Sequence, residues 1–137
     1  MNKKQFEARL KNAATAEERL ALMDAYGGDL FDRERYADAN GIYSQALRLA
    51  RQPNVKAYFA GRVGICHFNA GSDKEAFTFL LKSAGLFDPQ RPEFMSDMCG
   101  FVYFHLGSLY EYHGKTAKSL EARKKCEEYA DSQEKET

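Results

Sequence analysis

The stretch Tyr103-x-x-Leu106-Gly107-x-x-Tyr110 carries the spacing that decides the fold of this chain. The same spacing occurs at two earlier places, as Met23-x-x-Tyr26-Gly27-x-x-Leu30 and as Ala60-x-x-Val63-Gly64-x-x-His67. Small residues follow the three glycines at the same two distances: Ala39 and Ala46, Ala76 and Ser83, and Ser119 and Cys126. The recurring offsets predict three units, each built from two antiparallel helices that approach closely at the glycine and at the small residues.

This pattern resembles the tetratricopeptide repeat (TPR), which pairs a bulky-x-x-Leu-Gly-x-x-Tyr helix with an Ala-x-x-x-aromatic helix and a trailing proline. Pro53 and Pro89 stand at the proline position of the first two units. The glycines are 37 residues apart (27 to 64) and then 43 (64 to 107), against about 34 in the family. Arg123 stands where the third unit should have an aromatic residue. The resemblance implies an all-α fold, a right-handed TPR-like solenoid of three helix-hairpin units.

The boundaries follow from capping residues and helix breakers. We expect a single domain over residues 1–137, with a short N-terminal helix at 3–13, repeat units at about 16–53, 54–89 and 92–131, and a polar tail at 132–137. Asp32 is expected to cap the helix that follows it, and Pro92 to begin a long helix that runs to about residue 113. The last helix, from 115 to about 130, is polar over most of its surface. It is therefore expected to close the array, which would make the chain a complete small protein.

Composition argues against several classes of function. The chain has 20 basic and 20 acidic residues, and this zero net charge argues against binding to nucleic acid or to a membrane surface through bulk charge. The longest strongly apolar stretch, around residues 101–106, is too short to span a membrane, and the N-terminus has no secretory signal. Three cysteines without paired spacing fit a reducing compartment. We therefore expect a soluble, cytoplasmic protein.

The sequence contains no familiar catalytic or metal-binding pattern. Cys66 and His67 are adjacent on a predicted helix, so their side chains diverge and do not chelate one ion together. His105 and His113 are two helical turns apart, too far for a shared metal. A cysteine nucleophile with a remote histidine stays open as an alternative. We expect a non-enzymatic protein without cofactor or metal, whose cysteines act as small buried hydrophobes.

The resemblance also implies a binding site. In the TPR family, one face of each first helix lines a concave groove that holds an extended or helical peptide. The residues at these positions, the candidate groove residues, are Phe31, Asp32, Tyr58, Ile65, Phe68, Asn69, Phe101, Phe104, Glu111 and Tyr112, with Asp24 and Gly28 beside them. For Phe101 and Phe104, packing between neighbouring units is an equally good interpretation.

The chemistry of these positions excludes one binding mode of the family. Members that grip a chaperone's C-terminal carboxylate use Lys, Asn and Arg at places held here by Asp24, Gly28, Gly61, Ile65, Phe104 and Ser108. An aromatic lining with a few acids favours an apolar or mildly basic segment instead. The chain is therefore expected to be an adaptor that binds a protein or peptide partner.

Two alternatives stay open. Residues 87–94, followed by Cys99, are similar to a passage in the class II chaperones of type III secretion, which are also small three-repeat proteins. A self-assembling scaffold, in which the groove is filled by another copy of the chain, is the second alternative and would make the protein a homo-oligomer.

Overall fold

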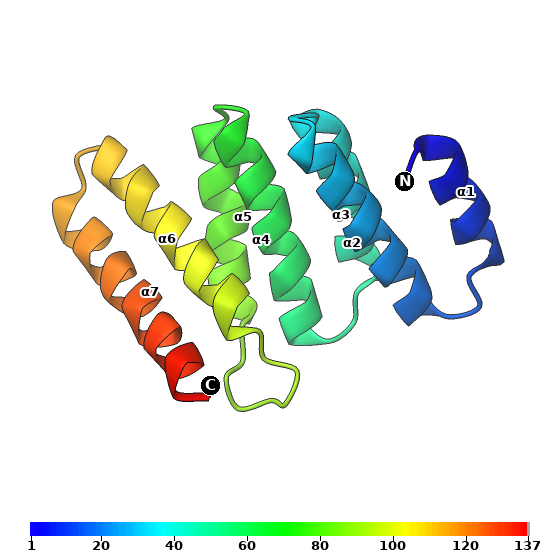
Figure 1. Cartoon of the computed structure of the whole chain (residues 1–137). Coiled ribbons are helices and arrows are strands. Elements are labelled where there is room, and N and C mark those ends of the chain that lie inside the picture. Colours follow the sequence, from blue (N-terminus) through cyan, green and yellow to red (C-terminus); the bar gives the residue numbers. More distant parts are fainter. Residues whose placement is uncertain (137) are drawn as a thin grey trace.

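The structure, a computed structural model, describes the backbone of residues 1–136 and the side chains of residues 1–129. This part of the chain forms seven helices and no strand: α1 (Lys3–Asn12), α2 (Ala16–Asp32), α3 (Tyr36–Leu49), α4 (Pro53–Asn69), α5 (Asp73–Leu86), α6 (Ser96–Tyr112) and α7 (Thr116–Glu136). Figure 1 shows that the helices follow one another across the molecule in chain order, from α1 at one end to α7 at the other. The prediction of an all-helical fold is confirmed, and the hairpins α2–α3, α4–α5 and α6–α7 correspond to the three predicted pairs.

The repeated glycine is the point of closest approach in each hairpin. It faces the side chain that stands 16 residues later: Tyr43, Leu80 and Arg123. A Cβ atom would lie 2.6 Å from a ring carbon at Gly27 and 2.7 Å from the leucine Cγ at Gly64. Both distances are too short for any side chain, so only glycine permits this packing. At Gly107 the nearest atom is the arginine Cγ at 3.3 Å, so the contact at this glycine is looser than in the other two hairpins.

Two buried serines fasten the second helix of a hairpin to the first. The Oγ atom of Ser83 donates a hydrogen bond to the carbonyl oxygen of Ala57 at 2.6 Å. Ser119 donates in the same way to the carbonyl oxygen of Gly107 at 2.9 Å, which confirms the predicted proximity of these two residues. The small residues of the pattern therefore supply hydrogen bonds as well as close packing.

The turn inside each hairpin has one residue with a positive φ, always seven residues after the repeated glycine: Glu34 (61°), Gly71 (80°) and Gly114 (73°). This left-handed conformation reverses the chain and suits glycine, whereas Glu34 adopts it with a side chain. The turn also corrects one prediction. Asp32 does not cap the next helix, because it is the last residue of α2, and α3 begins only at Tyr36.

The connection between α5 and α6 differs from the prediction as well. Pro92 does not begin a helix, since α6 begins at Ser96 and residues 87–95 form a loop. Asn54, which is fully buried on α4, holds the start of this loop through two hydrogen bonds. Its Nδ2 donates to the carbonyl oxygen of Asp88 at 3.1 Å, and the Asp88 backbone N–H donates to its Oδ1 at 2.7 Å.

The far end of the loop is held by aromatic packing. The ring of Phe94 lies edge-on against Phe87, with centroids 5.9 Å apart, and 5.5 Å from the ring of Tyr129 on α7. A loop anchored at both ends accounts for the longer interval between the second and third glycines.

The two ends of the chain are helical. At the N-terminus, Asn2 and Gln5 cap α1 reciprocally, and Phe6 stacks on Tyr26 with ring centroids 4.4 Å apart, so α1 covers the first hairpin. At the other end, α7 continues to Glu136, past the predicted end near residue 130. Residues 131–136 contain no glycine or proline to end a helix. The side chains of the predicted tail lie outside the described residues.

The core lies in two clusters along the row of helices. Tyr43 and Val63 are fully buried in the first, and Leu80 and Val102 in the second. No helix in the described part of the chain is both long and apolar enough to cross a membrane.

Candidate functional site

The exposed aromatic side chains of the candidate groove set collect on α6. Phe101, Phe104 and Tyr112 are 57%, 54% and 82% exposed. Within the described residues, neither phenylalanine is buried between units. Large apolar side chains that are exposed together on one helix form an accessible surface for a partner.

His105 joins two of these residues, Phe101 and Phe104, to Phe68 of α4. Its ring lies among the rings of Phe68, Phe104 and Phe101, with centroids 4.8, 5.4 and 6.1 Å away. The Nδ1 atom lies 2.8 Å from the carbonyl oxygen of Phe101, so the proton sits on Nδ1 and is donated to that oxygen. Burial lowers the pKa of His105, which keeps the ring neutral at pH 7. These four residues form what we call the α6 patch.

A hollow of about 400 Å³ lies next to this patch, between α4 and α6. Phe68 and Tyr112 both line it, so residues from two different units contribute to one concave surface. Asp73 lies at its edge, where its Oδ2 is 2.9 Å from Nε2 of His113. The hollow therefore combines two aromatic side chains with the carboxylate of Asp73, and Gly71, Ser108 and Leu109 complete its lining.

A second group of candidate residues lies between α2 and α4, around Arg62. Its guanidinium carbon lies 5.1 Å from the ring centroid of Tyr43, 5.8 Å from that of Phe31 and 5.9 Å from that of Tyr58. The hydroxyl of Tyr58 donates a hydrogen bond to Oδ1 of Asp24 at 2.6 Å. Burial, with this hydrogen bond, raises the pKa of Tyr58, and burial raises that of Tyr43 to about 12. Phe31 and Tyr58 are therefore half-buried around a cation.

Other candidate residues lie elsewhere. Ile65 is buried in the second core cluster, because α6 packs against this side of α4, and it does not line an open surface. Asp32, Asn69 and Glu111 are exposed near the C-terminal ends of α2, α4 and α6. The Asn69 side chain donates to the carbonyl oxygen of Ile65 at 2.9 Å, and Glu111 pairs with Arg123.

Sequence reasoning missed Arg62 and His105. Each stands two residues before a repeated glycine; the sequence analysis considered His105 only as a metal ligand and did not consider Arg62. In the structure both occupy the same place in their unit and are surrounded by aromatic rings. A polar residue at the same offset in two units was the available signal. Among the side chains that the structure describes, no three histidine, cysteine or acidic residues are grouped as metal ligands would be.

Comparison with known proteins gives one distant similarity to report. No protein-family model matches the chain, and no solved structure matches it. The photosystem I assembly protein Ycf3 of Rippkaea orientalis (strain PCC 8801 / RF-1) is 27% identical to it over 94 residues. The matched region is 69% of this chain and 53% of the relative, so the chain spans about half the length of the protein it matches.

Proposed function

We propose that this chain is a protein-interaction module without catalytic activity, built as a TPR-like right-handed solenoid of three hairpin units. The α6 patch is the observation that carries this proposal, since Phe101 and Phe104 are more than half exposed and Phe68, in the same patch, lines a hollow. An exposed cluster of large apolar side chains generally marks an interaction site. Aromatic residues are also enriched where proteins bind one another.

The partner segment lies along the face formed by α2, α4 and α6 as a peptide or a helix. The α6 patch and Tyr112 form the apolar part of this groove. Asp32 supplies an acidic group near the end of α2, where the helix dipole adds partial negative charge, whereas Glu111 near the end of α6 is already paired with Arg123. This combination favours an apolar segment that carries a basic residue. Phe31, Tyr58 and Asn69 extend the same face towards the first unit.

The similarity to a protein named for its role in assembly supports an interaction role, and we do not transfer that protein's target to this chain. We place the function in the cytoplasm, because free thiols such as Cys66 and Cys99 suit a reducing compartment. Neither nucleic acid nor a membrane is part of the proposal, since the net charge of the chain is zero.

Site-specific photocrosslinking in the native lysate tests the proposal. A photoreactive phenylalanine analogue at position 104 or 112 should crosslink to one discrete partner. The matched control places the analogue at position 120, because Leu120 is 63% exposed but lies on α7 and is not part of the α6 patch. Crosslinks of equal yield at position 120 would count against the groove.

The double variant Phe101→Ala with Phe104→Ala then tests the energetic role of the patch. Truncation of aromatic anchors at an interface typically costs about 2 kcal/mol or more each, so capture of the crosslinked partner should be lost. Helical content should stay unchanged, because both side chains are more than half exposed. Phe68→Ala is less suitable, since Phe68 packs against the second core cluster and its loss would also affect stability. A folded double variant that still binds places the site on another surface.

Two measurements distinguish the two alternatives. Light scattering that shows a dimer, lost in the double variant, would identify a second copy as the occupant and favour the scaffold. A partner that is itself secreted, and that is degraded without this chain, would favour a secretion chaperone. The residues that resemble such chaperones, 87–94, belong to the loop between α5 and α6.

A further inference from the structure

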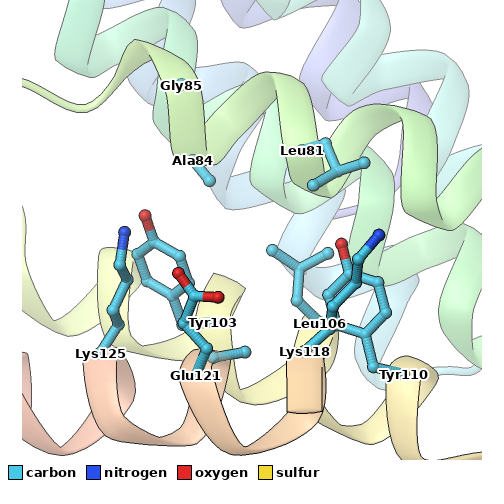
Figure 2. Close-up of a pocket in the computed structure, with 10 residues that line it drawn as sticks. Leu81, Ala84, Gly85, Tyr103, Leu106, Tyr110, Lys118, Glu121 and Lys125 are labelled. Carbon is cyan, nitrogen blue, oxygen red and sulfur yellow. The ribbon is translucent and has the colours of Figure 1, made fainter. Parts of the chain in front are cut away.

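A cleft of about 460 Å³ opens between α5 and the α6–α7 hairpin, on a different side of the molecule from the α6 patch. Figure 2 shows Leu81 and Ala84 of α5 facing Tyr103, Leu106 and Tyr110 of α6 across this space. Leu81 is 49% exposed, which is high for a leucine that borders a cleft. Much of the cleft lining is therefore apolar and open to solvent.

The corresponding space at the preceding joint, between α3 and the α4–α5 hairpin, is filled by Phe79. This side chain packs against the first core cluster and stacks on the ring of His67, with centroids 5.9 Å apart and planes 16° apart. Phe79 stands 15 residues after Gly64, and the residue at that distance from Gly107 is Ala122. Ala122 lines the cleft. The small alanine side chain leaves empty, between α5 and the α6–α7 hairpin, the volume that Phe79 fills between α3 and the α4–α5 hairpin.

This internal counterpart indicates what fits the cleft. Tyr110 holds the position of His67, three residues after the repeated glycine. An aromatic side chain of a partner that enters the cleft would therefore contact the ring of Tyr110, as Phe79 contacts the ring of His67. Leu106 and Leu81 supply the surrounding apolar contacts.

The charges around the cleft restrict the occupant further. Lys118 places its Nζ 5.7 Å from the ring centroid of Tyr110, and Lys125 places its Nζ 5.3 Å from that of Tyr103. Figure 2 shows Glu121 between the two lysines. Two ammonium groups and one carboxylate give the cleft edge a net positive charge, which favours carboxylates next to the entering ring.

We infer that this cleft is a second binding site, which takes an aromatic side chain of a partner peptide flanked by acidic residues. It is independent of the groove on α2, α4 and α6, whose surroundings favour a basic segment. A chain with both sites holds two segments of opposite charge character at once.

The test titrates the ¹⁵N-labelled protein with the blocked pentapeptide Asp-Glu-Phe-Glu-Asp and follows backbone amide shifts. Saturable shifts are expected at Leu81, Ala84 and Ala122. Replacing the peptide's Phe by Ala should weaken binding about tenfold, since the buried ring supplies most of the apolar contact. Replacing its four acids by lysine should also weaken binding.

Variants of the protein check the location. Ala122→Phe fills the cleft and should abolish the shifts. Leu81→Glu changes an exposed wall residue and should do the same without loss of fold, whereas the control Leu120→Glu should bind as the parent does. Reversing both charges with Lys118→Glu and Lys125→Glu should make the lysine peptide the tighter ligand.

Several outcomes would overturn the inference. These are the absence of saturable shifts, shifts confined to the α6 patch, and undiminished binding to Leu81→Glu. Equal affinity for the acidic and lysine peptides would remove the charge argument. Binding of N-acetylphenylalanine amide as tight as that of the peptide would identify a small aromatic molecule, and not a peptide, as the occupant.

Discussion

Alanine substitution at the repeated glycines should have opposite effects in the second and third hairpins. Alanine in place of glycine inside a helix gains about 1 kcal/mol of helix propensity, whereas overpacking a close contact costs about 1–3 kcal/mol. At Gly64 the new methyl would lie 2.7 Å from Cγ of Leu80 and 3.0 Å from its backbone nitrogen. Neither atom moves without a shift of α5, so the cost lies near the upper end, and we expect a net loss of about 1–2 kcal/mol.

At Gly107 the balance is reversed. The nearest atom is Cγ of Arg123 at 3.3 Å, in a long side chain that is about half exposed and moves aside at little cost. We therefore expect Gly107→Ala to be neutral or to stabilise the protein by up to about 1 kcal/mol. Gly41→Ala is the matched control, because Gly41 lies inside α3 with no atom within 4 Å of the added methyl, so only the propensity gain applies.

Thermal and urea unfolding followed by circular dichroism measure these differences. For a chain of this size, 1 kcal/mol corresponds to about 4 °C in Tm, so Gly64→Ala should melt about 4–8 °C below the parent. Gly107→Ala and Gly41→Ala should melt at or above it. Equal losses at the two repeated glycines, or a larger loss at Gly107, would refute the account of how the hairpins close.

Three further predictions concern buried polar groups. Asn54→Ala should cost about 1–3 kcal/mol and speed amide exchange at Asp88, because two partly buried backbone groups lose their partners; unchanged exchange there would contradict the anchoring role. Arg62→Ala should cost about 2 kcal/mol in urea unfolding, since it removes a cation in contact with three rings, and a variant as stable as the parent would show that these contacts contribute nothing. Burial raises the pKa of Cys66 and Cys99 from 9.0 to about 11, so the folded state retains protons that the unfolded state loses. The free energy of unfolding should therefore be constant below about pH 9 and decrease as the pH rises towards about 11. A free energy of unfolding that stays constant up to about pH 11 would contradict this prediction.

Much of the fold could be predicted because helix pairing depends on local spacing. The glycine and the small residues recur at fixed offsets, and Ser119 meets Gly107 as those offsets require. The beginning of α6 could not be predicted in this way. Pro92 is a good first residue for a helix, but the loop around it depends on Asn54, which is 34 residues before Asp88 in the sequence.

The site was predictable only in part, for a similar reason. Offsets place Phe104 and Ile65 on the same general face, yet one is exposed and the other buried. Ile65 is buried because α6, the first helix of the third hairpin, covers that side of α4. In residues 1–136 no further hairpin follows α7, so the corresponding side of α6 stays uncovered. Neighbour packing of this kind is tertiary information, which the offsets do not contain.

The anchored loop at residues 87–95 offers a place for protein engineering. Gln90 and Arg91 are exposed between the anchor at Asp88 and the packed ring of Phe94. An epitope tag or a small fluorescent reporter inserted between Gln90 and Arg91 enters a segment whose two ends are already held in place. The spacing of α5 and α6 then stays set by the anchors, and both chain termini stay native. Such an internally tagged chain would allow its partners to be followed in living cells.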